Sequence, residues 1–298
     1  MTSIYVLYNP FSGNGTGEDD ARILEVALPE PVSFFDMTKI TNYAAFLGGM
    51  ERDGILVIAG GDGTLNRFVN ATVGIDIPQE ILYFPIGTGN DFARDLGKRP
   101  YEDPFPVSAY LQDLPTVLVK GKTYRFLNGV GFGIDGYCCE EGHRLRQIPG
   151  KKVNYTAIAV RGLLSRFAAR NAKVTVDGQE HTYKKAWIAP TMHGKFYGGG
   201  MIPAPEQDRS NPDKTLSVMV FHGAGRLRAL YAFPGIFKGT HAKYKNLVAI
   251  HTGHEITVEF DRPTPLQIDG DIIPGVTGYT ARSARCGAEI PKTFAVRA

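Results

Sequence analysis

The chain has 298 residues, of which 43% are hydrophobic and 21% are charged, a balance that excludes a largely disordered protein. Lysine and arginine exceed aspartate and glutamate by only 33 − 30 = 3, so total charge does not indicate a nucleic-acid binder. At about 150 residues per domain, the length indicates two domains. Glycine is enriched, with 35 residues. The excess is clustered in short loops, so the feature to explain is the backbone conformation of those loops.

The first hundred residues alternate between apolar strands and helices. Strands are expected at 4–8, 32–35, 54–59 and 81–86, and helices at 18–28, 41–50, 64–73 and 91–96. Strands rich in Val, Ile and Leu that alternate with helices predict a parallel α/β sheet. Each strand runs into a Gly- or Asp-rich loop, at the sheet edge where such folds bind ligands.

The pattern changes after the proline-rich stretch 100–115. Strands are then expected at 116–120, 173–176, 183–189, 216–221, 248–251, 255–260, 266–268 and 278–281, with helices at 135–146, 153–167 and 225–237. Many strands separated by turn signals predict a mostly antiparallel β domain. We therefore expect an α/β domain over 1–122, which the tail 290–298 could join, and a β-rich domain over 123–289.

Two motifs are rejected. Gly121-Lys122-Thr123 ends like a P-loop, but Thr116 stands where the first glycine is required. Residues 131–136 fit G-x-G-x-x-G, yet they lie outside the alternating region and no acidic residue follows about 20 positions on.

The three cysteines, of which Cys138 and Cys139 are adjacent, form no disulfide framework or spaced metal site, as is typical of a reducing cytoplasm. No apolar run reaches the length of a transmembrane helix.

Three other glycine-bearing loops each follow a predicted strand directly. They contribute Asn9, Phe11, Ser12, Gly13, Asn14 and Gly15; Gly60, Gly61, Asp62, Gly63, Thr64, Leu65 and Asn66; and Gly87, Thr88 and Asn90. Glycines let backbone N–H groups converge on an anion, and the helix that follows adds positive partial charge. Beside phosphates, the Asp62 carboxylate is expected to hold a cation or take a proton. Ordinary tight turns explain one such loop, but they explain three poorly.

These loops read GGDGTLN at 60–66 and PIGTGNDFAR at 85–94, preceded by YNPFSG at 8–13. They resemble the diacylglycerol kinase catalytic-domain family, which includes bacterial diacylglycerol kinases, sphingosine kinase and ceramide kinase. The likeness continues through NGVGFGID at 128–135, GGGM at 198–201, GTH at 239–241 and QIDGD at 267–271. It thus covers nearly the whole chain in the right order.

The resemblance implies a two-domain kinase, with an N-terminal NAD kinase-like domain for the nucleotide and a C-terminal β-sandwich for the acceptor. It implies ATP contacts at 11–15, Thr38, 60–66 and Thr88, and a structural magnesium position at Asp213. Asp271 falls on the proton acceptor, where the family usually has Glu. Asp269 is expected to orient a metal-bound water, or to be a turn residue only.

We therefore expect a kinase that uses ATP and Mg²⁺ to phosphorylate diacylglycerol or a similar lipid alcohol. The alternatives are an NAD kinase-like enzyme, which shares the GGDGT loop, and a nucleotide-binding regulatory protein without turnover. The sequence leaves the oligomeric state open, and a homodimer is one of the possibilities.

A lipid substrate also implies a peripheral contact with a membrane. No acidic residue lies between Glu141 and Asp177 or from His222 to Lys245. Basic residues fill both stretches, namely Arg144, Arg146, Lys151, Lys152, Arg161, Arg166, Arg170, Lys173, Arg226, Arg228, Lys238, Lys243 and Lys245. Basic residues interleaved with aromatic ones suit an anionic lipid surface, although a solvated helix face gives the same pattern.

Overall fold

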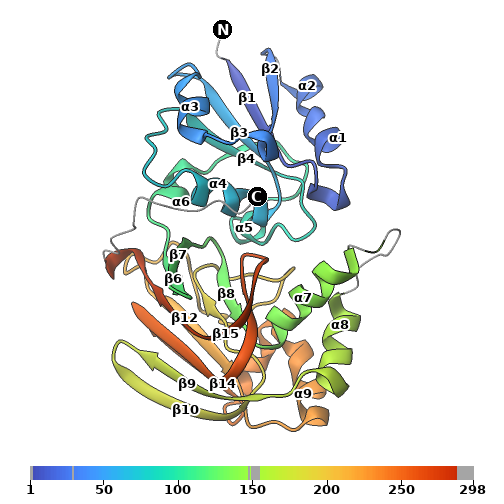
Figure 1. Ribbon diagram of the computed structural model, residues 1–298, viewed down its shortest axis with the longest axis vertical. Helices are drawn as coiled ribbons and strands as arrows, with labels where there is room; N and C mark the ends of the chain where they lie inside the picture. The colour runs from blue at the N-terminus through green and yellow to red at the C-terminus, as the bar shows by residue number, and fades with distance from the viewer. Residues whose placement is uncertain (1–2, 29, 147, 149–154, 287–298) are drawn as a thin grey trace. The chain divides into compact units, whose positions relative to one another are not determined.

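The computed structural model describes residues 3–28, 30–146, 148 and 155–286, with the side chains of 146, 155, 156, 165 and 166 left aside. The chain forms two compact units, Met1–Leu114 and Pro115–Glu289 (Figure 1). The expected attachment of the tail 290–298 to the first domain lies outside the described residues. In the described part of the chain, no helix combines the length and apolar character needed to cross a bilayer.

The first unit is built on a five-stranded sheet in the order β2-β1-β3-β4-β5. Its strands are β1 (Ile4–Tyr8), β2 (Val32–Asp36), β3 (Ile55–Gly60), β4 (Glu80–Pro85) and β5 (Phe105–Pro106). The first four are parallel, and β5 is antiparallel to β4. The predicted α/β class of this half is confirmed.

The helices of this unit are short. They are α1 (Gly17–Arg22), α2 (Leu24–Ala27), α3 (Tyr43–Gly48), α4 (Asp62–Ala71), α5 (Asp91–Asp95) and α6 (Ser108–Gln112). The single helix expected at 18–28 is divided at Ile23. The helix expected at 41–50 begins at Tyr43 because the Asn42 side chain caps it, accepting a hydrogen bond from the Ala45 N–H at 3.0 Å.

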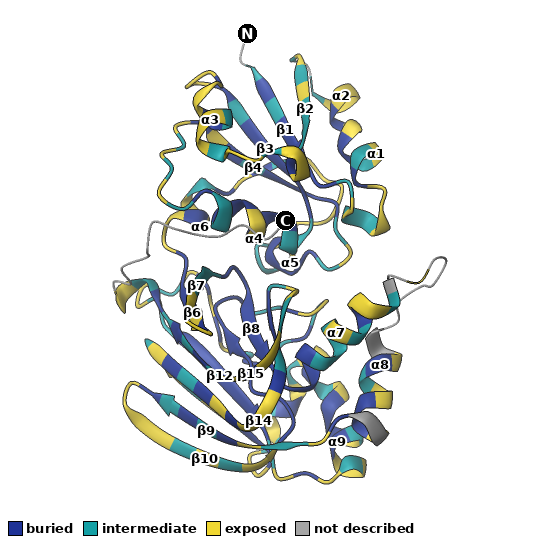
Figure 2. Ribbon diagram, viewed as in Figure 1, coloured by how far each residue is buried: buried dark blue, intermediate teal, exposed yellow. Residues whose placement is uncertain are grey.

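Strand β3 lies at the centre of the sheet, and its burial explains its composition. Leu56, Val57, Ile58 and Ala59 are all fully buried, so both faces of the strand are covered (Figure 2). A strand buried on both faces needs a continuous apolar run rather than an alternating one. The loop after β3 is therefore anchored on a rigid central element.

The second unit contains a ten-stranded antiparallel sheet in the order β13-β12-β11-β8-β14-β15-β6-β7, with β9 paired to β10 and β14. Its strands are β6 (Thr116–Val119), β7 (Lys122–Arg125), β8 (Gly129–Phe132), β9 (Arg170–Val176), β10 (Gln179–Ala186), β11 (Thr191–Met192), β12 (Leu216–Phe221), β13 (Val248–Gly253), β14 (Glu255–Ile268) and β15 (Asp271–Arg282). This agrees with the expected antiparallel sandwich. The boundary drawn at 122–123 falls inside the β6–β7 hairpin, and the change of sheet comes after Leu114.

One long hairpin, β14–β15, replaces the three separate strands expected at 255–260, 266–268 and 278–281. Pro263 and Pro265 cannot donate to a ladder, which made the sequence look broken there. The register shifts between Glu259 and Leu266 absorb them. The first part of β14 pairs with β9 and its end pairs with β8, so β14 joins these two parts of the sheet.

Helices cover one side of this unit: α7 (Ile134–Arg146), α8 (Tyr155–Arg161), the π-helical turn η3 (Gly162–Arg166), α9 (Arg226–Ala232) and the 3₁₀ segment η4 (Phe233–Lys238) (Figure 1). Gly131 and Gly136 of the rejected motif at 131–136 allow α7 to pack closely against β8 and β14. A Cβ on Gly131 would lie 1.7 Å from Asp135 Oδ2, and one on Gly136 would lie 2.1 Å from the Pro265 carbonyl oxygen. Protein atoms therefore fill the space that a nucleotide would need there.

Candidate active site

The three predicted loops follow β1, β3 and β4, which are adjacent parallel strands. Their carboxyl ends therefore share one edge of the sheet. From β1 the chain moves to β2 on one side and later to β3 on the other, so the strand order reverses between β1 and β3. Open α/β sheets bind ligands at this reversal point. The loops at 9–15 and 60–66 leave from the two strands that flank it.

Hydrogen bonds to the Thr64 hydroxyl join these two loops. The Asn9 Nδ2 atom donates to Thr64 Oγ1 at 3.1 Å, and the Ser12 hydroxyl lies 3.1 Å from the same oxygen. The Asn9 Oδ1 atom accepts a hydrogen bond from the Phe11 N–H at 3.0 Å. Asn9 and Thr64 are both buried. They therefore set the shape of the loops, while the Phe11 side chain is exposed.

The loops after β3 and β4 touch through glycine backbones. A Cβ on Gly87 would lie 2.3 Å from the Cα of Gly61, so a side chain at 87 does not fit. Asn90 has a φ of 50°, and its side chain forms hydrogen bonds with both the N–H and the carbonyl of Gly87. Its Oδ1 accepts from the Gly87 N–H at 3.0 Å, and its Nδ2 donates to the Gly87 carbonyl at 2.6 Å. Thr88 is exposed at the tip of this loop.

Asp62 joins the same two loops through its carboxylate. Its Oδ2 accepts from the Asp91 N–H at 2.9 Å, and its Oδ1 accepts from the Phe92 N–H at 2.8 Å. A Cβ on Gly89 would lie 3.3 Å from Oδ2, which places the carboxylate against the Thr88–Gly89 turn. Asp62, the first residue of α4, thus accepts from the first two N–H groups of α5 and brings a carboxylate to the loop after β4. A role toward a cation or a proton stays a prediction.

The remaining nucleotide candidates divide by exposure. Asn14, Gly15 and Thr38 are exposed, and the Thr38 hydroxyl donates to Asp36 Oδ1 at 2.6 Å. Gly60, Leu65 and Asn66 are buried, while Ser12, Gly13 and Gly63 are partly buried. Leu65 packs in the core of the unit, so its contribution is to hold α4. The backbone and the exposed tips of the loops are what a ligand at this edge would meet.

In the second unit, Asp269 and Gly270 form the two-residue turn between β14 and β15, with φ of 46° and 97°. Both positive φ values match the turn that suits such a hairpin, for which Asp-Gly is favoured. The Asp269 carboxylate accepts from three consecutive backbone N–H groups: Leu127 at 2.5 Å, Asn128 at 2.8 Å and Gly129 at 3.1 Å. The Asp269 carboxylate therefore fixes the backbone of residues 127–129. Asp271 begins β15 with its side chain exposed.

Two buried residues, the cationic Arg209 and His193, also contact this loop, and no sequence motif pointed to either. Arg209 donates to the Leu127 carbonyl at 3.3 Å and to Asn128 Oδ1 at 2.8 Å. His193 Nδ1 lies 2.8 Å from the Leu127 carbonyl oxygen. Burial and the charge of Arg209 lower the pKa of His193 to about 3, so its ring is neutral and donates there. Only long-range pairing brings these residues together, and no local motif marks them.

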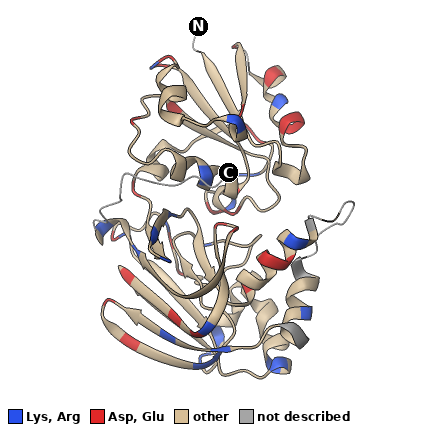
Figure 3. Cartoon of the chain, viewed as in Figure 1, with Lys and Arg blue, Asp and Glu red and all other residues tan. Residues whose placement is uncertain are grey.

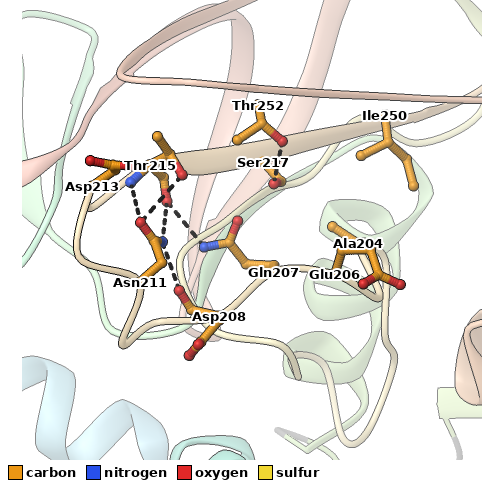
Figure 4. A pocket seen from close by; sticks show the side chains of 10 residues that line it. All are labelled: Ala204, Glu206, Gln207, Asp208, Asn211, Asp213, Thr215, Ser217, Ile250 and Thr252. Atoms are coloured by element: carbon orange, nitrogen blue, oxygen red, sulfur yellow. Dashed lines mark hydrogen bonds between the residues drawn. The ribbon is translucent and has the colours of Figure 1, made fainter.

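Asp213 lies beside a pocket of about 250 Å³ in the second unit (Figure 4). Its side chain is 70% exposed, and Oδ1 pairs with Arg285 at 3.2 Å. Arg285 also donates to the Pro212 carbonyl at 3.0 Å. Among the described residues, no three Asp, Glu, His or Cys side chains converge as metal ligands. The Arg285 guanidinium supplies positive charge beside Asp213, and a magnesium ion at this carboxylate stays a prediction.

Comparison with known proteins agrees with this architecture. Residues 3–113 match the family described as "Diacylglycerol kinase catalytic domain", and residues 128–286 match "YegS C-terminal NAD kinase beta sandwich-like domain". The chain is 29% identical over 225 residues to a diacylglycerol kinase of Mycobacterium tuberculosis, covering 72% of this chain and 70% of that protein. It resembles the crystal structure of a diacylglycerol kinase from Bacillus anthracis with a TM-score of 0.62, at 20% identity, covering 95% and 94% of the two chains. This last likeness shows the fold.

Proposed function

The chain belongs to the family that joins a diacylglycerol kinase catalytic domain to a YegS-type β-sandwich, a lipid kinase family, and we propose that it transfers the γ-phosphoryl group of MgATP to a lipid alcohol. The observation that carries the proposal is the set of three glycine-bearing loops at one sheet edge around the reversal point of the strand order. Backbone N–H groups at such an edge suit phosphate oxygens.

In this proposal the loops bind the nucleotide, and their own contacts keep them in shape. The close approach of Gly61 and Gly87 and the hydrogen bonds of Asn90 hold the turn that contains the exposed Thr88. Asp62 holds that turn to the start of α5 and places a carboxylate beside the phosphates. Positioning and charge neutralisation are the main protein contributions to phosphoryl transfer.

The proton of the acceptor hydroxyl goes to Asp271 in this proposal. The Asp269 carboxylate is engaged by three backbone N–H groups, which suits a positioning residue better than a base. Asp271 has its side chain exposed at the start of β15. A general base must reach within about 3 Å of the hydroxyl, directly or through one water.

The acceptor that we propose is diacylglycerol, on the strength of the relatives' names. The alternative acceptor is NAD, because the family description of the second unit refers to an NAD kinase-like sandwich. A further alternative is a nucleotide-binding regulatory protein without turnover. All three use the same loop edge, so the acceptor assay separates them.

The test is incubation with γ-labelled ATP and Mg²⁺ and, in separate reactions, diacylglycerol in mixed micelles, a lipid extract, NAD, or no acceptor. Labelled phosphatidic acid that disappears in the Asp271→Asn variant supports the proposal. Labelled NADP supports the NAD kinase alternative, and ATP binding without any labelled product supports the regulatory one. If diacylglycerol is not labelled while another lipid from an extract is, the lipid kinase holds and the named substrate is wrong.

A further inference from the structure

The outward side of α8 and η3 is apolar where a solvated helix would be polar. Ile158, Leu163 and Phe167 are buried, and they tie the segment to the core. Val160 and Leu164, four positions apart, are 42% and 50% exposed. Residues four apart share one helix face, so these two side chains form a stripe that points to solvent.

The same pattern recurs on α9 and η4. Ala229, Ala232, Phe233 and Ile236 are buried, at the spacing of one helix face. On the other side, Leu227 is 81% exposed, Tyr231 is 79% exposed and Phe237 is 46% exposed. Together, Val160, Leu164, Leu227, Tyr231 and Phe237 account for five of the large hydrophobic residues that the described part of the chain exposes, and we call them the helical apolar surface.

The two stripes lie on neighbouring elements. Helix α9 packs against η3. The Arg226 guanidinium donates to the Leu163 carbonyl at 2.6 Å and lies over the Trp187 ring, with its central carbon 5.7 Å from the ring centroid. The first residue of α9 is therefore fixed to the second residue of η3. Figure 2 shows exposed segments on both α8 and α9.

The two chain segments that carry the helical apolar surface contain charged side chains of one sign only. Residues 142–176 and 214–254 contain no Asp or Glu. The exposed basic side chains of these segments include Arg161, Arg228, Lys238, Lys243 and Lys245. In Figure 3, α8 and α9 carry Lys or Arg and no acidic segment, whereas α7 carries acidic residues. Lys151 and Lys152, also expected to contribute, lie outside the described residues.

We propose that the helical apolar surface docks on a bilayer surface that contains anionic lipid. Apolar side chains on the outward face of a helix, flanked by Lys and Arg, are the combination that binds such an interface. The basic residues attract anionic headgroups, and Leu227 and Tyr231 enter the boundary between headgroups and acyl chains. The proposal stands on exposure and charge and does not require turnover, so it goes beyond the proposed function.

The experiment is co-sedimentation of the full chain with vesicles of phosphatidylcholine alone or of phosphatidylcholine with phosphatidylglycerol, without ATP or diacylglycerol. We expect at least about tenfold more binding to the anionic vesicles. Raising NaCl from about 0.1 M to about 1 M shortens the Debye length from ~10 Å to ~3 Å and should weaken that binding strongly.

The decisive variant is Leu227→Ala/Tyr231→Ala, because both side chains are largely exposed and Ala favours a helix. We expect at least about a fivefold loss of vesicle binding. The matched control is Val26→Ala, which removes an apolar side chain that is 93% exposed on α2 in the other unit and should change nothing.

Equal vesicle binding by wild type and by the double variant would overturn the proposal, as would indifference to anionic lipid. A dimer in sedimentation velocity that the double variant dissociates would instead identify this surface as a contact between two copies. Since no step requires catalysis, vesicle binding by a chain without lipid kinase activity would count against the proposed function alone.

Discussion

The Asp269 carboxylate accepts the backbone N–H of Asn128 at 2.8 Å, which joins the hairpin turn before β15 to the loop before β8. Arg209 holds the Asn128 side chain from the other side at 2.8 Å. The loop is thus fixed through backbone and side chain by opposite charges. The two carboxylates of the Asp-Gly-Asp sequence at 269–271 therefore differ in their surroundings. Asp269 binds the backbone of a neighbouring loop, whereas Asp271 is exposed at the start of β15.

Asp269→Asn should destabilise the protein, because an amide presents an N–H₂ group where three backbone N–H groups need acceptors. Hydrogen bonds to a charged group contribute about 1.5–3 kcal/mol each, so we expect a loss of about 3 kcal/mol in the free energy of unfolding. Urea denaturation measures it. A variant as stable as the wild type would show that these hydrogen bonds are dispensable.

Asp271→Asn should behave in the opposite way. Its exposed position predicts a stability change within about 0.5 kcal/mol, whereas loss of a general base lowers kcat by about 10²–10⁴. The KM for ATP should stay nearly unchanged, and Asp271→Glu should retain activity if the turn adjusts to the longer side chain. Steady-state kinetics with diacylglycerol checks this. Near wild-type turnover by Asp271→Asn would remove the residue from the mechanism.

Gly87→Ala should disturb the loop edge of the first unit. The new Cβ would lie 2.3 Å from the Gly61 Cα, and backbone cannot move aside as a side chain can. Overpacking of this kind costs about 1–3 kcal/mol, and we expect weaker nucleotide binding as well. Isothermal titration with ATP and urea denaturation measure both effects. The control is Gly48→Ala at the end of α3, where nothing lies within 4 Å of the added Cβ.

The sequence revealed the loop edge because its signals are local. A continuous apolar run marks β3, and glycines directly after it mark a tight approach, so the candidate loops could be found without coordinates. Partners distant in sequence left no such mark. Nothing near Asp62 shows that its carboxylate binds the backbone of Asp91, and nothing near Arg209 points to Asn128.

The sequence also misled where local chemistry and pairing disagree. Pro263 and Pro265 look like a break between strands, yet β14 runs through them because register shifts leave their missing N–H groups outside the ladder. A distant partner also meets Asp213, which pairs with Arg285, 285 − 213 = 72 residues further along the chain. The magnesium position that the resemblance implies at Asp213 stays a prediction.

Asp62→Asn should affect both activity and the start of α5. An Asn side chain has one acceptor oxygen for two backbone donors, so one hydrogen bond is lost and the free energy of unfolding falls by about 1.5–3 kcal/mol. If the nucleotide binds as proposed, loss of the Asp62 charge should also lower kcat by about 10² or more. Kinetics at a temperature where the variant is fully folded, judged by circular dichroism, separates the effects. Retention of more than half the activity would reject a catalytic role.

Asp135 should make stability depend on pH in an unusual direction. It is buried in the second unit, where Tyr197 donates to its Oδ2 at 3.1 Å, and no donor in the described part of the chain reaches Oδ1. Burial raises the pKa of Asp135 to about 6, above its ordinary value of 3.8. The folded state therefore favours the protonated acid, and the stabilisation it gives is complete below about pH 4 and lost as the pH rises through 6.

The matched variant isolates this effect from all other titrating groups. At about 1.4 kcal/mol per pKa unit, wild type should lose about 2.4 kcal/mol relative to Asp135→Asn between pH 4 and pH 7, because the amide stays neutral throughout. Urea denaturation of both proteins at several pH values gives the difference. At pH 7 the variant should be at least as stable as the wild type. A difference that does not change with pH, or one that changes in the opposite direction, would show that Asp135 is ionised in the folded protein.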